Sequence, residues 1–284
     1  MKKLTVLATT AMITTAMVCG CGATQNDISV ISREEGSGTR GAFVELFGVE
    51  QKDADGNKVD YTTEEASITS STSVVLTSVA GDDNAIGYIS LGSLNYTVKA
   101  LEIDGVLPSV ANIKDGSYSI ARPYNIVVND NLTETASDFI AYILSVDGQQ
   151  IVTDNGYIAL DTTTEYEPQD MTGTIVVAGS SSVSPVMEKL AESYEAINPD
   201  VDVQIQTSDS STGVSSTIEG VCDIGMASRD LKDSELESGV TAINIAMDGI
   251  AVIVNQNNPL NNLTTEQVRN IYMGEITTWD ELEQ

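Results

Sequence analysis

The chain has 284 residues, of which 42 are acidic and 13 are basic, so its formal net charge is −29 at pH 7. Such an acidic surface is a poor match for nucleic acid or for anionic lipid head groups. Because the sequence contains no histidine, Ser-His-Asp and Cys-His nucleophile systems are excluded, together with most zinc sites.

The N-terminal segment predicts export. Two lysines precede an apolar stretch over residues 4–18, a pattern typical of a secretory signal and too short for a transmembrane helix. We expect the signal to cover residues 1–20 and to end in a motif that resembles a bacterial lipobox, whose cysteine carries lipid such as palmitate. Gly20 suits the cleavage enzyme better than Val18 does, so Cys21 is the predicted lipidation site. An ordinary cleaved signal is the alternative.

Strand and helix patterns alternate along the rest of the chain. The expected strands are 28–32, 82–91, 119–129, 174–179, 201–206, 221–228 and 243–255, and the expected helices are 41–47, 70–81, two within 136–156, 185–197, 214–220 and 264–273. This alternation predicts an α/β fold in which helices cover the faces of a parallel sheet. The polar stretch 161–173 contains a proline and has no periodicity, so we expect a linker there.

Two other features favour structural roles. The segment DADGNKVD (53–60) has some character of a calcium loop, but its glycine falls at the fourth position instead of the sixth, so a hairpin turn is favoured. Cys222 lies in an apolar run and is interpreted as a buried structural thiol. With Cys21 lipidated, no disulfide remains within the chain. We expect no metal and no cofactor.

Loops rich in serine and glycine lie between a strand and a helix at three places: REEGSGTRGAF over 33–43, GSSSVSP over 179–185 and SDSSTG over 208–213. A helix N-terminus offers unpaired backbone N–H groups and partial positive charge, and hydroxyl groups add donors. Any single loop of this type also fits an ordinary helix cap. Three such loops, one of them beginning with Arg33, favour a shared oxyanion site.

Segments along nearly the whole chain resemble the phosphate-binding lipoprotein of bacterial phosphate ABC transporters. They are ISVISREEGSGTRGAF, GTIVVAGSSSVSPVMEKLAESY, VQIQTSDSSTGV, DIGMASRDL, MDGIAVIVN and IYMGEITTWDEL. The resemblance implies a type II periplasmic-binding-protein fold, with two α/β lobes, a two-strand hinge and the anion in the cleft. It also implies a monomeric, non-enzymatic solute-binding protein, anchored only by its lipid at the extracellular face of the membrane. Its partners would be inorganic phosphate and ABC permease subunits.

The resemblance also assigns the phosphate contacts residue by residue. They are Arg33, Ser37, Gly38, Thr39, Ser181, Ser182, Val183, Ser210 and Ser228. Arg33 is the charged donor, and Glu35 matches an acidic residue that orients this arginine in the family. Ser228 stands where many family members have an aspartate, which accepts the proton of hydrogen phosphate. A serine is expected to reject a fully deprotonated anion such as sulfate less firmly.

The order of the segments differs from that of the family. There the GTIVVAGSSSV-like segment opens the mature protein and the SREEGSGTRGAF-like segment follows GEITTWDEL, whereas here SREEGSGTRGAF comes first. We interpret the chain as a circular permutant, a change that proteins tolerate where exposed ends lie close together. A fragment of a tandem array and an artefact of gene assembly are the alternatives. In the permutant, residues 21–27 form the tether, 28–118 and 251–284 form lobe B, and 119–250 form lobe A.

The permutation predicts particular contacts. The region 26–27 should approach Gln284, and strand 28–31 should join the same parallel sheet as strand 251–255. Helix 264–273 should cover that sheet. Its inward-facing residues are expected to be Leu263, Val268 and Ile271.

Two other functions stay open. One is a surface phosphoesterase or other hydrolase that uses a serine loop, and the other is a sensor or binding module for a sulfate-like oxyanion. The missing histidine argues against the hydrolase, as does the lack of a recognisable set of metal ligands.

Overall fold

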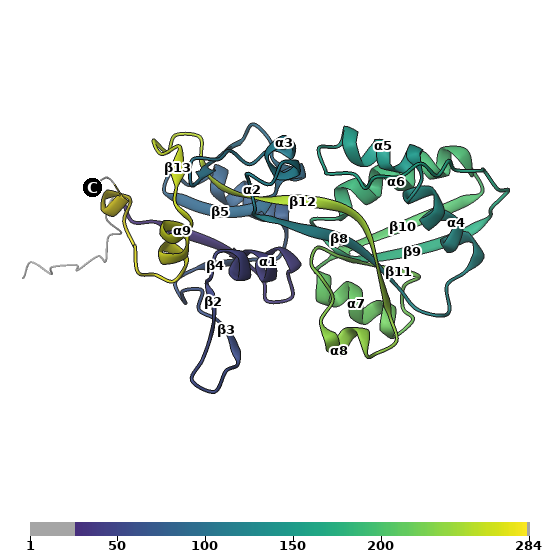
Figure 1. Ribbon diagram of the computed structural model, residues 1–284, viewed down its shortest axis with the longest axis horizontal. Helices are drawn as coiled ribbons and strands as arrows, with labels where there is room; N and C mark the ends of the chain where they lie inside the picture. The colour runs from purple at the N-terminus through teal and green to yellow at the C-terminus, as the bar shows by residue number, and fades with distance from the viewer. Residues whose placement is uncertain (1–25, 283–284) are drawn as a thin grey trace, which may run out of the picture.

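A nine-stranded mixed sheet runs through the molecule in the order β10-β9-β11-β8-β12-β5-β1-β4, with β6 paired to β12 (Figure 1). The computed structural model describes residues 26–282, so the expected signal (1–20), Cys21 and Gln284 lie outside the described residues. The strands of this sheet are β1 (Ser29–Arg33), β4 (Ser67–Thr69), β5 (Ala85–Ser90), β6 (Val98–Ala100), β8 (Ala121–Val128), β9 (Gly173–Ser180), β10 (Val201–Ser208), β11 (Ile224–Ala227) and β12 (Thr241–Asn255).

Helices and two small strand pairs complete the fold. The helices are α1 (Gly38–Leu46), α2 (Thr72–Ala80), α3 (Val110–Lys114), α4 (Glu134–Ile143), α5 (Val146–Asp154), α6 (Ser184–Ile197), α7 (Ser210–Ile218), α8 (Asp233–Leu236) and α9 (Thr265–Tyr272). The small pairs join β2 (Glu50–Lys52) to β3 (Lys58–Asp60), and β7 (Glu102–Ile103) to β13 (Asn262–Leu263). The β2–β3 pair is antiparallel, which confirms the predicted hairpin at 53–60. Within residues 26–282, no helix has the length and apolar character needed to cross a membrane.

The molecule has two halves, and β8 and β12 run between them (Figure 1). We call the first the Arg33 half (β1–β7, β13, α1–α3 and α9) and the second the Ser182 half (β9–β11 and α4–α8). β12 serves both: residues 241–249 pair with β8, and residues 250–254 pair with β5. The two strands therefore carry backbone hydrogen bonds continuously from one half to the other.

Each half has its own apolar core. In the Arg33 half, alternate residues of β5 point to opposite faces of the sheet, so Tyr88 packs with Phe43 of α1 and Tyr272 of α9, whereas Ile89 packs with Val79 of α2. Leu263, Val268 and Ile271 are buried in this core, which confirms their predicted inward orientation. In the Ser182 half, α4, α5 and α6 pack on strands β8, β9 and β11.

The direction of β12 differs from the prediction. Strand β1 does share a sheet with β12, through β5 between them, but β12 is antiparallel to β5. The reason is the path of the chain: β1 and β5 run toward the junction of the halves, and β12 leaves that junction when it enters the Arg33 half. The predicted parallel sheet is therefore a mixed one.

The two ends of the described chain lie side by side in the Arg33 half. The Ile28 N–H donates to the Thr277 carbonyl at 2.8 Å, and the Trp279 N–H donates to the Asn26 carbonyl at 3.0 Å. Asn26 Nδ2 also donates to Asp280 Oδ1 at 2.8 Å. Region 26–28 therefore contacts residues 277–280 of the C-terminal segment, whereas the predicted approach to Gln284 itself lies outside the described residues.

Candidate anion-binding site

The N-termini of helices α1, α6 and α7 meet at the junction of the two halves, where the three serine- and glycine-rich loops lie. Ser37 caps α1 by accepting a hydrogen bond from the Arg40 N–H at 3.3 Å. Gly38 permits the N-terminus of α1 to approach the Ser182 half closely. A Cβ at this position would lie 2.5 Å from Ser210 Oγ and 2.7 Å from Ser228 Oγ, both across the junction. Both distances are shorter than a real Cβ contact, so a side chain at position 38 would force Ser210 or Ser228 to shift.

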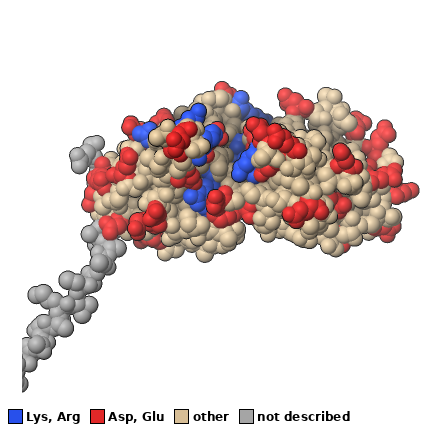
Figure 2. All heavy atoms as spheres, turned by 90° about the horizontal axis from the view of Figure 1, so that it is seen from below, with Lys and Arg blue, Asp and Glu red and all other residues tan. Residues whose placement is uncertain are grey.

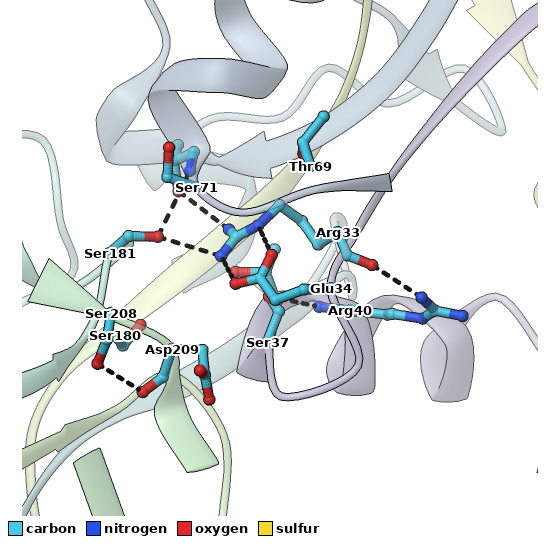
Figure 3. Close-up of polar contacts among 12 residues, drawn as sticks. Arg33, Glu34, Ser37, Arg40, Thr69, Ser71, Ser180, Ser181, Ser208 and Asp209 are labelled. Atoms are coloured by element: carbon cyan, nitrogen blue, oxygen red, sulfur yellow. Dashed lines mark hydrogen bonds and ion pairs between the residues drawn. The ribbon is translucent and has the colours of Figure 1, made fainter. Parts of the chain in front are cut away.

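Arg33 connects the two halves from the end of β1. Only 2% of its surface is exposed. Nη2 donates to Ser181 Oγ at 3.1 Å (Figure 3), and Nη1 donates to Thr72 Oγ1 at 3.3 Å. The carbonyl of Arg33 accepts a hydrogen bond from Arg40 Nη1 at 2.8 Å, which fixes the strand end beside α1. The buried guanidinium is therefore held at the centre of the site.

Further hydroxyl groups from both halves gather at the junction. Ser182 Oγ lies 2.8 Å from Thr39 Oγ1 and 3.0 Å from Thr72 Oγ1. Ser228 Oγ lies 3.0 Å from Ser180 Oγ and 3.3 Å from Ser210 Oγ. The structure thus brings together residues that the sequence places on separate loops. Ser182 bonds across the junction to Thr39 and Thr72, whereas Ser228 bonds to Ser180 and Ser210 within its own half.

Val183 has a local role in this structure. It precedes α6, and its N–H donates to the Ser180 carbonyl at 3.0 Å. Ser182 N–H similarly donates to Ser180 Oγ at 3.3 Å. Both N–H groups belong to the turn at the N-terminus of α6, so an anion there would replace bonds that the loop makes within itself.

The carboxylate that holds Arg33 is Glu34, and the prediction of Glu35 was wrong. Glu34 Oε1 lies 2.6 Å from Arg33 Nη2, and Oε2 lies 2.7 Å from Nε (Figure 3). Glu35 is exposed. The backbone turns here, with the Ser37 N–H bonded to the Glu34 carbonyl at 3.0 Å, so Glu34 folds back over the arginine while Glu35 lies at the tip of the turn.

Thr72 is a site residue that the sequence analysis did not identify. It is buried, and its hydroxyl contacts both Arg33 and Ser182. It begins helix α2, whose cap Ser71 accepts a hydrogen bond from the Val74 N–H. A fourth helix N-terminus therefore faces the same place. The stretch Ser-Ser-Thr-Ser (70–73) at the start of this helix was the available signal, but it lacks the glycines of the other loops.

Two buried tyrosines support the loops from behind. The Tyr88 hydroxyl accepts a hydrogen bond from the Arg33 N–H at 3.0 Å and lies 2.8 Å from Ser32 Oγ. Burial raises the pKa of Tyr88, so this hydroxyl stays neutral. Tyr124 O–H lies within hydrogen-bond distance of the Ser182 carbonyl (2.9 Å) and of Ser90 Oγ (2.8 Å). The end of β1 and the loop that follows β9 are therefore fixed to the sheet by side chains outside the loops.

This arrangement suits a small oxyanion. One guanidinium and several hydroxyls converge with four helix N-termini, and each of these favours negative charge. The carboxylate of Glu34 occupies one edge of the guanidinium, which leaves Nη1 and Nη2 directed to the hydroxyls of Thr72 and Ser181. An anion that entered between the halves would exchange hydroxyl–hydroxyl bonds for bonds to its own oxygens.

Comparisons with known proteins agree with this architecture. A family model described as "PBP superfamily domain" matches residues 11–147 and 164–284. The "Phosphate-binding protein PstS 2" of Streptococcus agalactiae is 52% identical over 287 residues, which cover 99% of this chain and 98% of the relative. The protein of the same description from Streptococcus pneumoniae is 50% identical over 256 residues, covering 90% of this chain and 87% of the relative.

A solved structure shows the same fold. A crystal structure of a phosphate-binding protein of a phosphate ABC transporter from Streptococcus pneumoniae superposes with a TM-score of 0.71 at 48% identity, and it covers 90% of this chain and 100% of the other. Fold and site together define a type II periplasmic-binding-protein architecture, as predicted. The chain belongs to the PBP superfamily.

Proposed function

We propose that this chain is an extracytoplasmic solute-binding protein that captures inorganic phosphate between its two halves and delivers it to an ABC permease, without performing chemistry on it. The observation that carries the proposal is the position of Arg33, buried and bonded to hydroxyls of Thr72 and Ser181 from opposite halves. The relatives described above as phosphate-binding proteins support the choice of anion.

Calorimetry tests this function directly. A chain without residues 1–21 is titrated with phosphate and with sulfate. Saturable binding of one phosphate per chain, tighter than that of sulfate, is expected. Absence of phosphate binding contradicts the proposal, and release of phosphate from a phosphomonoester replaces it with a hydrolase.

We infer that Ser228 sets the margin between phosphate and sulfate. Its hydroxyl is fully buried and lies among Ser180, Ser210 and the backbone of Gly38. A hydroxyl can accept the proton of hydrogen phosphate, but unlike a carboxylate it does not repel a fully deprotonated anion. Ser228→Asp is therefore expected to raise the ratio of phosphate to sulfate affinity. An unchanged ratio in a variant that still binds phosphate rejects this role.

Attachment to the membrane through lipid on Cys21 is part of the proposal. Its support is the apolar segment 4–18 with Gly20 before the cysteine. Cys21→Ser is expected to abolish labelling by a fatty-acid probe and to release the protein or leave it unprocessed. Continued labelling of this variant excludes Cys21 as the lipidation site.

We also propose that residues 119–250 act as one lobe and that 28–118 with 251–284 act as the other, in a circularly permuted order. Separate cores and the paired chain ends support this division. The two streptococcal relatives align with this chain almost from end to end. The phosphate-binding protein of Pseudomonas aeruginosa aligns over only 39% of this chain at 32% identity. A partial alignment of this kind is expected when the segments stand in a different order in the two chains.

A second permutation tests this order. Joining residue 282 to residue 26 through a short linker and opening the chain within 161–172 restores the order expected of the family. The resulting protein is expected to fold and to bind phosphate as the parent does. A protein that folds but no longer binds phosphate contradicts the permutation.

A further inference from the structure

A groove with a cavity volume of about 600 Å³ lies beside the anion-binding site, between the two halves. The Arg33 half contributes α1 and the β2–β3 hairpin, and the Ser182 half contributes the loop 229–232, with the start of β8 between them. Figure 2 views this side of the molecule and shows Lys and Arg residues gathered around the junction of the halves, while patches of Asp and Glu are scattered over both halves. We call this feature the basic groove because its share of cations, which are Lys58, Arg122, Arg229 and Lys232, is high for so acidic a chain.

The basic groove adjoins the anion-binding site through Arg229. Nη2 of this arginine donates to Ser211 Oγ at 3.2 Å, and Ser211 follows the site residue Ser210. The Ser211 N–H donates across the junction to the Gly36 carbonyl at 3.2 Å. These contacts lie between the groove and the site residue Ser210, so separation of the halves at Ser211 and Gly36 would connect the groove to the site.

Cations are concentrated in this groove relative to the whole chain. Lys58, Arg122, Arg229 and Lys232 line it, together with Glu45, Glu50 and Asp230. Lys58 lies 2.8 Å from Glu50, and Arg229 lies 2.8 Å from Glu235. Cations and carboxylates are therefore nearly balanced here, whereas the chain as a whole has 42 acidic and 13 basic residues. Such a lining repels an approaching anion less than a surface with the average charge of this chain would.

A second hollow borders the site on another side. Its volume is about 380 Å³, and its lining includes Thr72, Ser181 and Ser184. Glu188 is the only charged residue among the described residues that line it. An anion that approached through this hollow would pass a carboxylate with no cation beside it in the lining.

We propose that the basic groove is the route by which phosphate reaches its site, and that its lysines increase the association rate by steering the anion. Clefts lined by one sign of charge raise the local concentration of an oppositely charged ligand, and the effect weakens with ionic strength. In this acidic protein, a groove with nearly equal numbers of cations and carboxylates repels an anion less than the average surface does, and so it also favours the anion's approach. The inference rests on the proposed function, because it concerns how the same anion arrives.

Stopped-flow fluorescence of the soluble chain, mixed with inorganic phosphate, measures the association rate. The test variant is Lys58→Gln/Lys232→Gln, since both lysines line the groove and neither contacts Arg33 or the hydroxyls around it. At separations of about 10 Å, each removed charge is expected to slow association about two- to threefold at an ionic strength of about 10 mM, and less than about twofold at 0.15 M. The dissociation rate should stay nearly constant.

Lys114→Gln/Lys189→Gln is the matched control. It changes the net charge equally, neither lysine lines the groove, and Lys189 is paired with Glu192 much as Lys58 is paired with Glu50. This control is expected to slow association less than the groove variant does. Equal slowing by both pairs overturns the proposal in favour of a general effect of net charge.

Glu188→Gln separates the two routes. If phosphate passes through the basic groove, this change should leave the association rate nearly constant. Faster association of Glu188→Gln, combined with no effect of Lys58→Gln/Lys232→Gln, overturns the proposal and assigns the route to the hollow beside Ser181. Failure of the parent chain to bind phosphate in calorimetry instead rejects the proposed function, so the two failures are distinguishable.

Discussion

Replacing Arg33 should weaken phosphate binding more than replacing any serine of the site. Arg33→Gln removes the one guanidinium in the cluster, and a hydrogen bond to a charged group contributes about 1.5–3 kcal/mol. This corresponds to a loss of affinity of about 10- to 150-fold. Ser210→Ala removes a neutral hydroxyl, which corresponds to about 0.5–1.5 kcal/mol, or about 2- to 12-fold.

Glu34 adds to the effect of Arg33→Gln. Its carboxylate forms two contacts of 2.6 and 2.7 Å with the guanidinium, and without the arginine it remains beside the anion as an uncompensated negative charge. The double variant Arg33→Gln/Glu34→Gln is therefore expected to bind phosphate more tightly than Arg33→Gln alone. A double-mutant cycle that includes Glu34→Gln isolates this coupling.

Isothermal titration calorimetry at one ionic strength gives the affinities, and circular dichroism with thermal unfolding shows whether each variant is folded. The reasoning is refuted if folded Arg33→Gln binds phosphate as tightly as Ser210→Ala does. It is also refuted in part if the double variant binds no better than Arg33→Gln, because Glu34 would then not lie against the bound anion.

Three other changes test the structure. Thr72→Val should lower phosphate affinity about 2- to 12-fold in calorimetry, since it removes a buried hydroxyl of the site; Thr77→Val, an exposed change in the same helix, is the control, and equal affinities would remove Thr72 from the site. Asp248→Asn should lower the free energy of unfolding in urea by about 3–5 kcal/mol, because it leaves the buried Arg122 without its ion-pair partner; a loss below about 1 kcal/mol would mean that the pair contributes little. Burial opposes ionisation of Glu235, but hydrogen bonds from a neighbouring guanidinium and a backbone N–H outweigh it and hold the pKa of Glu235 below its ordinary value. Its ionised form therefore stabilises the fold above the ordinary glutamate pKa of about 4.3, and this contribution is lost as the pH falls through the lower folded pKa. Glu235→Gln should unfold at a lower temperature than the parent at pH 7, with a smaller difference near pH 3, and an equal difference at both pH values contradicts the assignment.

The loops of the site were predictable because their signals are local. Serines and glycines between an apolar strand and an amphipathic segment predict a helix N-terminus, and this prediction does not depend on the rest of the fold. Ser37, Ser182 and Ser210 could therefore be placed from short windows of sequence. The buried side of α9 was predictable for the same reason, since Val268 and Ile271 repeat at helical spacing.

Contacts between residues far apart in the sequence could not be predicted from local patterns. Thr72 is 110 residues from Ser182 and 39 residues from Arg33, so no local pattern joins them. The choice between Glu34 and Glu35 depends on the turn that follows β1, which determines the carboxylate that folds back over the guanidinium. The direction of β12 depends on where the chain crosses between the halves, and alternation of apolar residues is the same for parallel and antiparallel strands.

The shared strand β12 couples the two halves, so we expect them to unfold together. Its 15 residues, Thr241–Asn255, exchange hydrogen bonds with β8 in one half and with β5 in the other. Loss of either core would leave part of this strand with unpaired buried backbone groups, which is costly. We therefore expect a single calorimetric unfolding transition, with the enthalpy of the whole chain. The amide protons of β8, β5 and the centre of β12 should exchange with solvent only when the entire molecule unfolds.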